Sequence, residues 1–352
     1  MPELPILADP SHYRPCIQDL LGDGPRVREY WLALFERHVV TLAGLPLHDG
    51  RFDDHSRWPA FRQEYLAGLA DLRRSPGSRG ELTVLELTRY REEQLRACGF
   101  FDPFDVLKQR ENRLALKMLP AYLRELDALP PRDRIEQLAR GLFAGNQFDM
   151  GSPAVVDAFE RGTFDFHAAC ARLPRRPWAV DDFDAWANRW RQEDRAYRRV
   201  LFFVDNAGPD IVLGAIPWAR FLAGRGADVV LAANSGPALN DVTATELRGL
   251  LRTCGELDAV LGAQLDAGRV RAVESGCTSP LIDLGRITQE CCDAARASDL
   301  LILEGMGRAV ESNYDARFTV DTLKLALIKD PMVAEIIGVK LFDPIFRFER
   351  RP

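Results

Sequence analysis

Oxygen-bearing side chains stand close together at two places in the C-terminal half of the chain. Asp205 and Asn206 follow an apolar run, and Asp241 lies shortly after the next apolar run. Carboxylate and amide oxygens are the ligands that hard cations such as Mg²⁺ and Mn²⁺ prefer. These three residues are therefore candidate metal ligands. Asp and Asn also cap helices, and the spacing leaves both roles open for Asp241.

Groups suited to an anion occur in three further segments. Asn234, Ser235 and Gly236 form a short turn whose backbone N–H groups suit a phosphate, although such turns are also common in plain connections. Arg308 ends a glycine-containing turn and has the forked donors that bind phosphate, but a solvated surface arginine fits equally. Lys329 follows an apolar run, where a lysine ordinarily faces water.

The residues around Asp205 also favour one kind of nucleophile. Haloacid-dehalogenase phosphatases place a second Asp two residues after the nucleophilic Asp, but that position here is Ala207. This departure favours attack by a metal-bound water over an aspartyl-phosphate intermediate. No Ser-His-Asp order or Cys-His pairing is apparent, and the segment from His48 to His55 is typical of a solvated loop.

The secondary structure that must position these residues changes near residue 200, from predicted helices to alternating strands and helices. Helical spacing of apolar residues predicts helices over 26–40, 86–97, 111–119, 121–126 and 181–199, with a break or kink at Pro120. Beyond this region, strands are predicted over 200–204, 228–233, 270–273, 300–303 and 338–346, and helices over 211–223, 241–253, 284–297 and 319–328. We expect a helical N-terminal region, 1–195, and an α/β domain, 196–352.

This alternation predicts a Rossmann-like, doubly wound and mostly parallel sheet, of the α/β class. Ligands bind such sheets beyond the carboxyl ends of the strands. If the strands are neighbours, Asp205, Asn234, Ser275 and Glu304 meet at one rim.

Composition excludes several classes of function. The 352 residues are 47% hydrophobic and 28% charged, with a formal net charge of −6 and no basic block, so no nucleic-acid partner is expected. No apolar run reaches the roughly 18 residues of a membrane span, and the first residues lack the pattern of a signal peptide. Seven scattered cysteines favour a reduced, cytoplasmic protein. Homo-oligomerisation is left open.

Five segments, taken in order, resemble the motif set of the metal-dependent damage-control phosphatases, formerly domain of unknown function 89. They are Ala144-Gly-Asn-Gln-Phe-Asp-Met-Gly151, Phe203-Val-Asp-Asn-Ala-Gly208, Leu239-Asn-Asp-Val-Thr243, Glu304-Gly-Met-Gly307 and Leu327-Ile-Lys-Asp330. The longer string over 232–243 is similar to the branch that includes the phosphatase domain of pantothenate kinase 4. The resemblance extends from about residue 25 to the end.

The resemblance implies a divalent metal (Mn, Mg, Co or Ni) on Asp205, Asn206 and Asp241, and hydrolysis of small phosphate monoesters. The implied partner is a small phosphorylated metabolite: 4′-phosphopantetheine or its oxidised, damaged forms in this branch, and sugar phosphates in others. Asp205 or Asp241 is implied to accept the proton of the attacking water.

The resemblance also implies roles around the metal. Lys329 and Arg308 would neutralise the transferring phosphoryl group. Asn146 and the loop with Ser235 and Gly236 would orient the phosphate. Asp149 would hold the loop of Asn146 or reach the ligand, and the role of Glu304 stays open.

Two other functions remain as alternatives. A Rossmann-like sheet with an acidic strand end also suits an S-adenosylmethionine-dependent methyltransferase, but the segment after residue 204 is a poor glycine-rich loop. A catalytically inactive binding module is the third hypothesis, and the intact set of three metal-binding residues argues against it.

Overall fold

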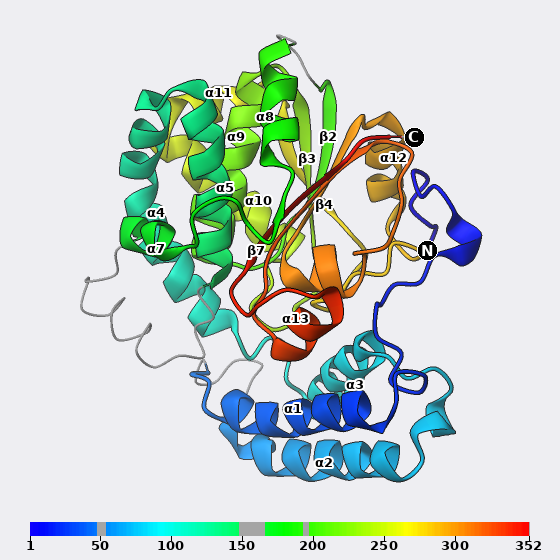
Figure 1. Ribbon diagram of the computed structural model, residues 1–352. Helices are drawn as coiled ribbons and strands as arrows, with labels where there is room; N and C mark the ends of the chain where they lie inside the picture. The colour runs from blue at the N-terminus through cyan, green and yellow to red at the C-terminus, as the bar shows by residue number, and fades with distance from the viewer. Residues whose placement is uncertain (48–53, 148–165, 193–196, 352) are drawn as a thin grey trace.

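One sheet of seven strands forms the centre of the part of the chain that the structure describes, which comprises residues 1–47, 54–147, 166–192 and 197–351 of the computed structural model. The strand order is β1-β7-β6-β5-β2-β3-β4 (Figure 1). The strands are β1 (Val180–Asp181), β2 (Arg199–Phe203), β3 (Asp228–Ala233), β4 (Val270–Glu274), β5 (Leu300–Glu304), β6 (Asp321–Leu327) and β7 (Pro344–Glu349).

Every pair of neighbouring strands is parallel except β6 and β7, which are antiparallel. β2 lies between β3 and β5, so the carboxyl ends of the strands predicted over 200–204, 228–233, 270–273 and 300–303 meet at one edge. The predicted α/β class with a mainly parallel sheet is confirmed. A short β1, from before residue 195, pairs with β7, so both regions share one sheet, and the boundary at 195 stays a prediction.

Alternating residues of the central strand face two different cores. Val200 and Phe202 of β2 belong to one apolar cluster, and Leu201 and Phe203 belong to the other. One face is covered by helices α4 (Asp105–Ala128), α5 (Pro131–Gln147), α7 (Phe166–Arg172), α8 (Phe183–Gln192), α9 (Ile216–Gly224), α10 (Ala244–Leu257) and α11 (Ala259–Asp266). Because its side chains alternate between two apolar cores, β2 is apolar from Val200 to Phe203.

The other core is covered by α1 (Pro25–Ala43), α2 (Trp58–Arg74), α3 (Val84–Ala97), α12 (Gln289–Ala297) and α13 (Pro331–Ile337). In Figure 1, α1, α2 and α3 lie together at the bottom of the view, below α13. Short 3₁₀ helices occupy Pro10–His12, His55–Arg57 and Pro76–Arg79. Among the described residues, no helix is both long and apolar enough to cross a membrane.

Two predicted helices differ from the structure. The segment predicted as a helix over 319–328 forms strand β6, all of whose residues are buried. A short apolar run buried on both faces has no period that separates a strand from a helix. The helix predicted over 284–297 begins only at Gln289, because Thr288 caps it by accepting from the N–H of Cys291.

Smaller differences concern helix boundaries and Pro120. The segment predicted as a helix over 211–223 begins as a π-helix, Asp210–Ala215, and continues as α9. Pro120 lies inside α4, which runs unbroken from Asp105 to Ala128, so the predicted break is absent. The final strand, predicted over 338–346, is β7, which begins at Pro344.

Candidate active site

Backbone hydrogen bonds draw the loop after β3 back toward the end of β2. Val242 donates its N–H to the carbonyl of Asp205 at 3.0 Å, and Ala207 donates to the carbonyl of Asn240 at 2.9 Å. Asn206 and Asp241 form an isolated antiparallel bridge. The three predicted metal ligands therefore lie together at the carboxyl edge of the sheet.

Asp241 does not cap the helix that follows it. Helix α10 begins at Ala244, and its cap is Thr243, which forms a reciprocal capping box with Glu246. The side chain of Asp241 is 1% exposed and turns instead toward the end of the sheet. The alternative reading of Asp241 as a helix cap is therefore wrong.

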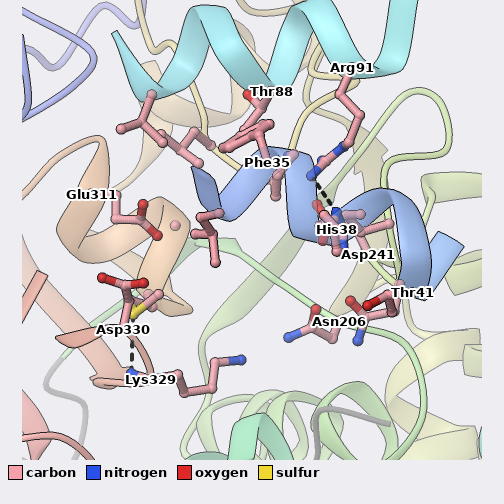
Figure 2. Close-up of a pocket in the computed structure, with 18 of the residues that line it drawn as sticks. Phe35, His38, Thr41, Thr88, Arg91, Asn206, Asp241, Glu311, Lys329 and Asp330 are labelled. Atoms are coloured by element: carbon pink, nitrogen blue, oxygen red, sulfur yellow. Dashed lines mark hydrogen bonds between the residues drawn. The ribbon is translucent and has the colours of Figure 1, made fainter. Parts of the chain in front are cut away.

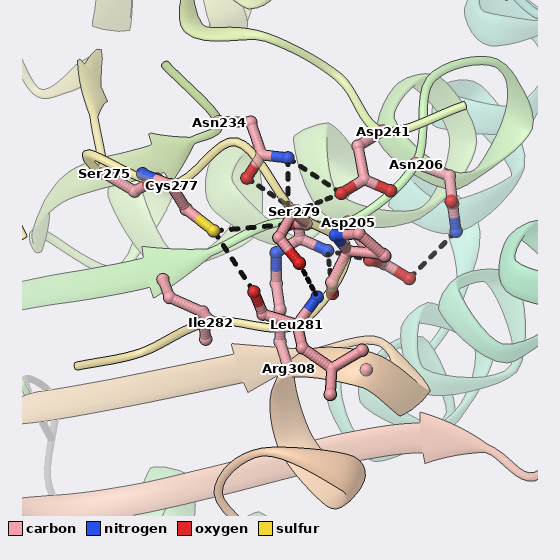
Figure 3. A network of polar contacts seen from close by, with 12 residues as sticks. Asp205, Asn206, Asn234, Asp241, Ser275, Cys277, Ser279, Leu281, Ile282 and Arg308 are labelled. Carbon is pink, nitrogen blue, oxygen red and sulfur yellow. Dashed lines mark hydrogen bonds and ion pairs between the residues drawn. The ribbon is translucent and has the colours of Figure 1, made fainter. Parts of the chain in front are cut away.

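Arg308 lies between the two predicted metal-binding aspartates (Figure 3). It is 1% exposed, its Nη1 donates to Asp205, and its Nη2 donates to Asp241 at 2.8 Å and to Asn234 at 3.0 Å. Burial alone would lower the pKa of Arg308, but the carboxylates of Asp241 and Asp205 outweigh it and raise that pKa. Arg308 is thus an internal counter-ion, not the solvated arginine that the sequence left open.

The sequence reasoning did not single out Asp210 and left the role of Glu304 open, yet both belong to the same buried network. Oδ2 of Asp210 accepts from the side-chain amides of Asn146 and Asn206, each at 2.9 Å. Glu304 accepts from the backbone N–H of Asp205 at 2.8 Å. Asp210 falls five residues after Asp205, and only its place at the start of a π-helix turns it back toward the strand end.

Burial raises the pKa values of three acids of this network. It raises the pKa of Asp210, and the nearby Asp205 carboxylate adds to the effect. It raises the pKa of Glu304 well above its ordinary value, with Asp210 and Asp205 acting in the same sense. Burial also raises the pKa of Asp241, against the opposing charge of Arg308. A cation placed among these groups would relieve both the desolvation and the repulsion.

The residues present fit a hard divalent cation. Carboxylate oxygens of Asp205, Asp210 and Glu304 lie within 4.8 Å of one another, and all three side chains are buried. Buried oxygens of Asn146 (Oδ1) and Asp210 (Oδ1) have no hydrogen-bond partner in the part of the chain that the structure describes. With Asp241 the network has four carboxyl groups, and Arg308 is the one cation that forms an ion pair with them among the described residues.

The orientation of Asn206 also suits a ligand. Its side-chain Nδ2 donates to Asp205 and to Asp210, each at 2.9 Å. The amide oxygen therefore points away from these two carboxylates, toward the space beside Asp241 that Figure 2 shows. Hydrogen bonds of this kind, from the neighbours of a ligand, fix its orientation.

Two glycines permit the close packing of this network. Gly305 has a positive φ of 96°, and a Cβ there would lie 2.3 Å from Cγ of Asp205. A Cβ at Gly145 would lie 2.7 Å from Cα of Asp210, where α5 meets the π-helix. Both sites require a residue without a side chain.

A cavity of about 530 Å³ opens beside the network. Asp205 lines it together with Asn206, Asp241 and Lys329, the last three of which Figure 2 labels. The Nζ of Lys329 donates to the backbone carbonyl of Asn146 at 2.9 Å. Lys329 follows strand β6 and not a helix, so it projects from the same edge as Asp205. The expectation that it simply faces water is wrong.

Glu311 is a further carboxyl group on this cavity, and no feature of the sequence singled it out. It is 6% exposed, and Figure 2 shows it facing the side of the cavity formed by Lys329 and Asp330. Burial raises the pKa of Glu311 to about 8, with Asp330 adding to the shift and Lys329 opposing it. No local motif marks Glu311, since it ends a π-helix of six residues, Met306–Glu311.

The opposite wall of the cavity is built by the N-terminal helices. Its apolar residues come from α1, α3, α4 and the segments beside them: Trp31, Leu34, Phe35, Leu45, Val84, Phe104 and Leu107. The cavity thus has one wall of charged strand ends and one wall of apolar helix residues.

Ser235 and Gly236 do not reach this cavity. They line a separate one with Asp102, Asp105 and Glu246, and the N–H of Ser235 already donates to Cys277 at 2.8 Å. Asn234 is in the network, where its Nδ2 donates to Asp241 at 2.8 Å. Asn146 is also in the network, at the end of α5, and Asp149 lies outside the described residues.

Buried carboxylates and a lysine at the carboxyl edge of a parallel sheet are groups with which an α/β protein can hold a divalent cation beside an anionic ligand. Residues 39–345 match the damage-control phosphatase ARMT1-like domain. The chain belongs to this family, which confirms the predicted resemblance and the predicted phosphatase class.

Individual relatives agree with this assignment. The chain is 40% identical to a damage-control phosphatase of Arabidopsis thaliana, covering 99% of this chain and 96% of that protein. It is 39% identical to pantothenate kinase 2 of Arabidopsis thaliana and 35% identical to the 4′-phosphopantetheine phosphatase of Mus musculus, with 98% of this chain covered in each. The chain spans 41% and 48%, respectively, of the length of these last two relatives.

A solved structure shows the same fold. The crystal structure of a DUF89 family protein from Pyrococcus horikoshii superimposes with a TM-score of 0.64 at 17% identity, covering 90% of this chain and 96% of that one.

Proposed function

We propose that this protein is a metal-dependent phosphatase of small phosphate monoesters, and that its substrate is 4′-phosphopantetheine or an oxidised form of it. The observation that carries the proposal is the cavity of about 530 Å³ with buried acids and Lys329 on one wall and apolar helix residues on the other. A phosphorylated head fits the first wall, and an extended organic arm fits the second.

We assign the metal to Asp205, Asn206 and Asp241, with Asp210 and Glu304 as neighbours that orient the ligands. All three assigned residues line the cavity, whereas Asp210 and Glu304 do not. A divalent cation held there would act as a Lewis acid on the phosphoryl group and would lower the pKa of a water.

The remaining steps fall to side chains of the chain itself. Lys329 has donors beyond the one that it gives to Asn146, and its charge suits the phosphoryl oxygens as negative charge builds up on them. Asp205 and Asp241 are the candidate acceptors for the proton of the attacking water. Arg308 holds these two carboxylates in place and does not line the cavity.

The apolar wall favours 4′-phosphopantetheine over a sugar phosphate. A sugar carries a hydroxyl on most of its carbons, and each hydroxyl that is buried without a partner costs free energy. The side chains of Leu34 and Phe35, which line this wall, have no hydrogen-bonding group. The indole N–H of Trp31 is already used, because it donates to Gln18. A partly aliphatic arm buries its carbon atoms there favourably. The name of the Mus musculus relative points the same way.

The test is a panel of esters assayed with Mg²⁺, Mn²⁺, Co²⁺ or Ni²⁺ after treatment with a chelator. The panel contains p-nitrophenyl phosphate, 4′-phosphopantetheine, its sulfonate form and glucose 6-phosphate. We expect hydrolysis only with added metal, and a higher kcat/KM for the two pantetheine esters than for the sugar ester. Metal-independent hydrolysis would contradict the metal site, and preference for glucose 6-phosphate would contradict the substrate.

A further inference from the structure

The helical wall of the cavity is mainly apolar, and its polar side chains come from α1 and α3, which also contribute Thr41 and Thr88. His38 of α1 and Arg91 of α3 both line the cavity, and Figure 2 shows the guanidinium of Arg91 reaching toward the ring of His38. Their contact joins Nη1 of Arg91 to Nδ1 of His38 at 3.3 Å. No hydrogen bond or ion pair joins this pair to Asp205, Asn206 or Asp241, so the proposed hydrolysis does not account for it.

Arg91 is held firmly in the wall. It is 3% exposed, its Nε donates to Glu92 at 2.9 Å, and its guanidinium carbon lies 5.4 Å from the centre of the Phe35 ring. Glu92 is 5% exposed and balances the charge of Arg91. A buried ion pair in an apolar wall is a poor source of stability compared with apolar side chains, so its presence calls for another role.

The contact with Arg91 decides which nitrogen of His38 carries the proton. A guanidinium group has donors and no acceptor, so Nδ1 of His38 must be the acceptor. In the neutral ring the proton then sits on Nε2. Burial and the charge of Arg91 lower the pKa of His38 to about 3, which keeps the ring neutral near pH 7.

The Nε2–H of His38 has no acceptor among the described residues. His38 is partly buried on the cavity, so this group is a donor that no described residue satisfies, in a largely apolar place. Because Glu92 already balances Arg91, a second anion gains little here, whereas a neutral carbonyl oxygen satisfies the donor without adding charge.

We propose that the Nε2–H of His38 donates a hydrogen bond to a neutral carbonyl oxygen in the organic arm of the substrate, and that Arg91 is a positioning residue that holds the ring in this tautomer. The inference rests on the proposed phosphatase function and extends it. The ligand class is a phosphate monoester whose alcohol portion carries an amide or similar carbonyl. His38 would then select among esters without taking part in the chemical step.

The kinetic test compares two esters in each variant. The quantity measured is the ratio of kcat/KM for 4′-phosphopantetheine, which carries amide carbonyls, to kcat/KM for p-nitrophenyl phosphate, which has none. His38→Leu should lower this ratio by roughly three- to tenfold, the size of one neutral hydrogen bond. His38→Gln should keep most of it, because its amide oxygen can accept from Arg91 while its N–H₂ donates. Val40→Ala, at a 75% exposed position of the same helix, is the control.

A spectroscopic test addresses the tautomer independently of turnover. The ¹⁵N shifts of the His38 ring should show a proton on Nε2 in the wild type, and Arg91→Met should give a mixture of tautomers. A proton on Nδ1 in the wild type would overturn the inference.

The kinetic outcomes separate this inference from the function on which it rests. The role of His38 would be overturned if His38→Leu left the ratio of kcat/KM unchanged, as equal losses on both esters would do. It would also be overturned if the wild type hydrolysed p-nitrophenyl phosphate but not 4′-phosphopantetheine. Failure of the wild type to hydrolyse p-nitrophenyl phosphate with any metal would contradict the proposed function instead, and the ¹⁵N measurement would still decide the tautomer.

Discussion

The two walls of the cavity differ in how they are built. The strand-end wall brings together residues from distant segments, such as Asp205 and Arg308, which are 103 positions apart in sequence and form a buried ion pair. The helical wall comes mainly from α1 and α3, and its residues are apolar except for a few such as His38 and Arg91. We infer that the first wall serves the reaction and the second wall serves the choice of substrate.

This difference has a physical cause. Charges buried at the edge of a parallel sheet are tolerable only where opposite charges or a cation compensate them. Few substitutions are therefore tolerated in the strand-end wall. An apolar helix face has no such requirement and can change its shape by single substitutions. Substitutions on the two walls should therefore affect different kinetic quantities.

The largest effect is expected at Asp205. Asp205→Asn keeps the shape of the side chain but removes a charge from the assigned metal site, and we expect kcat on p-nitrophenyl phosphate with Mn²⁺ to fall by about 10³-fold or more, beyond the 10–100-fold typical of residues behind the ligands. Asp293→Asn, at an exposed i,i+3 ion pair with Arg296, is the matched control. Full activity in Asp205→Asn, with an unchanged circular dichroism spectrum, would refute the assignment.

Arg308 should matter mainly for stability. Arg308→Met leaves Asp205 and Asp241 without their buried partner, and we expect a loss of roughly 3–5 kcal/mol in the free energy of unfolding in chelator. Added Mn²⁺ should restore part of it, because a bound cation replaces the missing charge.

Urea titration measures both values. Arg317→Met removes an exposed partner of Glu349 and should cost less than about 1 kcal/mol. An equal loss in the two variants would show that Arg308 does not act as the counter-ion of the site.

A polar residue on the helical wall should change selectivity by a smaller factor. Leu34→Asn places an amide where the organic arm is expected, and we expect the ratio of kcat/KM for 4′-phosphopantetheine to that for glucose 6-phosphate to fall roughly three- to tenfold. Leu257→Asn, at a 43% exposed position of α10, is the control for the same change of residue type. A ratio that does not move would remove the helical wall from substrate recognition.

The smallest expected effect is a pH dependence of stability that comes from Glu311. Since its pKa is raised to about 8, the native state binds a proton that the unfolded state releases between about pH 4.5 and pH 8. The contribution of Glu311 is therefore fully present at low pH and is lost as the pH rises through about 8. Glu311→Gln should make the melting temperature fall less steeply between pH 5.5 and pH 8.5.

Asp210, Asp241 and Glu304 also have raised pKa values, and they contribute to the pH dependence of the melting temperature in both proteins. The difference between wild type and variant therefore isolates Glu311. Identical slopes, measured by thermal melting in chelator, would show that Glu311 is ionised in the folded protein at neutral pH.

Local patterns predicted most of the sheet and the polar pair at its centre, Asp205 and Asn206. Apolar runs of five or six residues followed by polar turns marked β2 and β3, and the chemistry of Asp205 and Asn206 after β2 suggested a metal. The pattern misled at β6, because a strand buried on both faces lacks the alternation that distinguishes it from a helix. Lys329 was consequently placed at a helix end instead of a strand end.

The tertiary structure alone decided which polar residues meet. Arg308 has the sequence context of a surface residue, and only its burial against Asp205 and Asp241 makes it a counter-ion. Ser235 had the local signature of an anion site, but its N–H is used by Cys277 and its side chain lies on another cavity.

The sequence by itself determined the class of fold, the family and the candidate oxygen ligands at the end of β2, because each depends on residues that are adjacent or regularly spaced. Only the tertiary structure decided the partners of those ligands, the place of Asp210 and Glu304, and the apolar wall with His38. Charge pairing and burial depend on contacts between segments far apart in the chain, and a one-dimensional pattern does not contain those contacts.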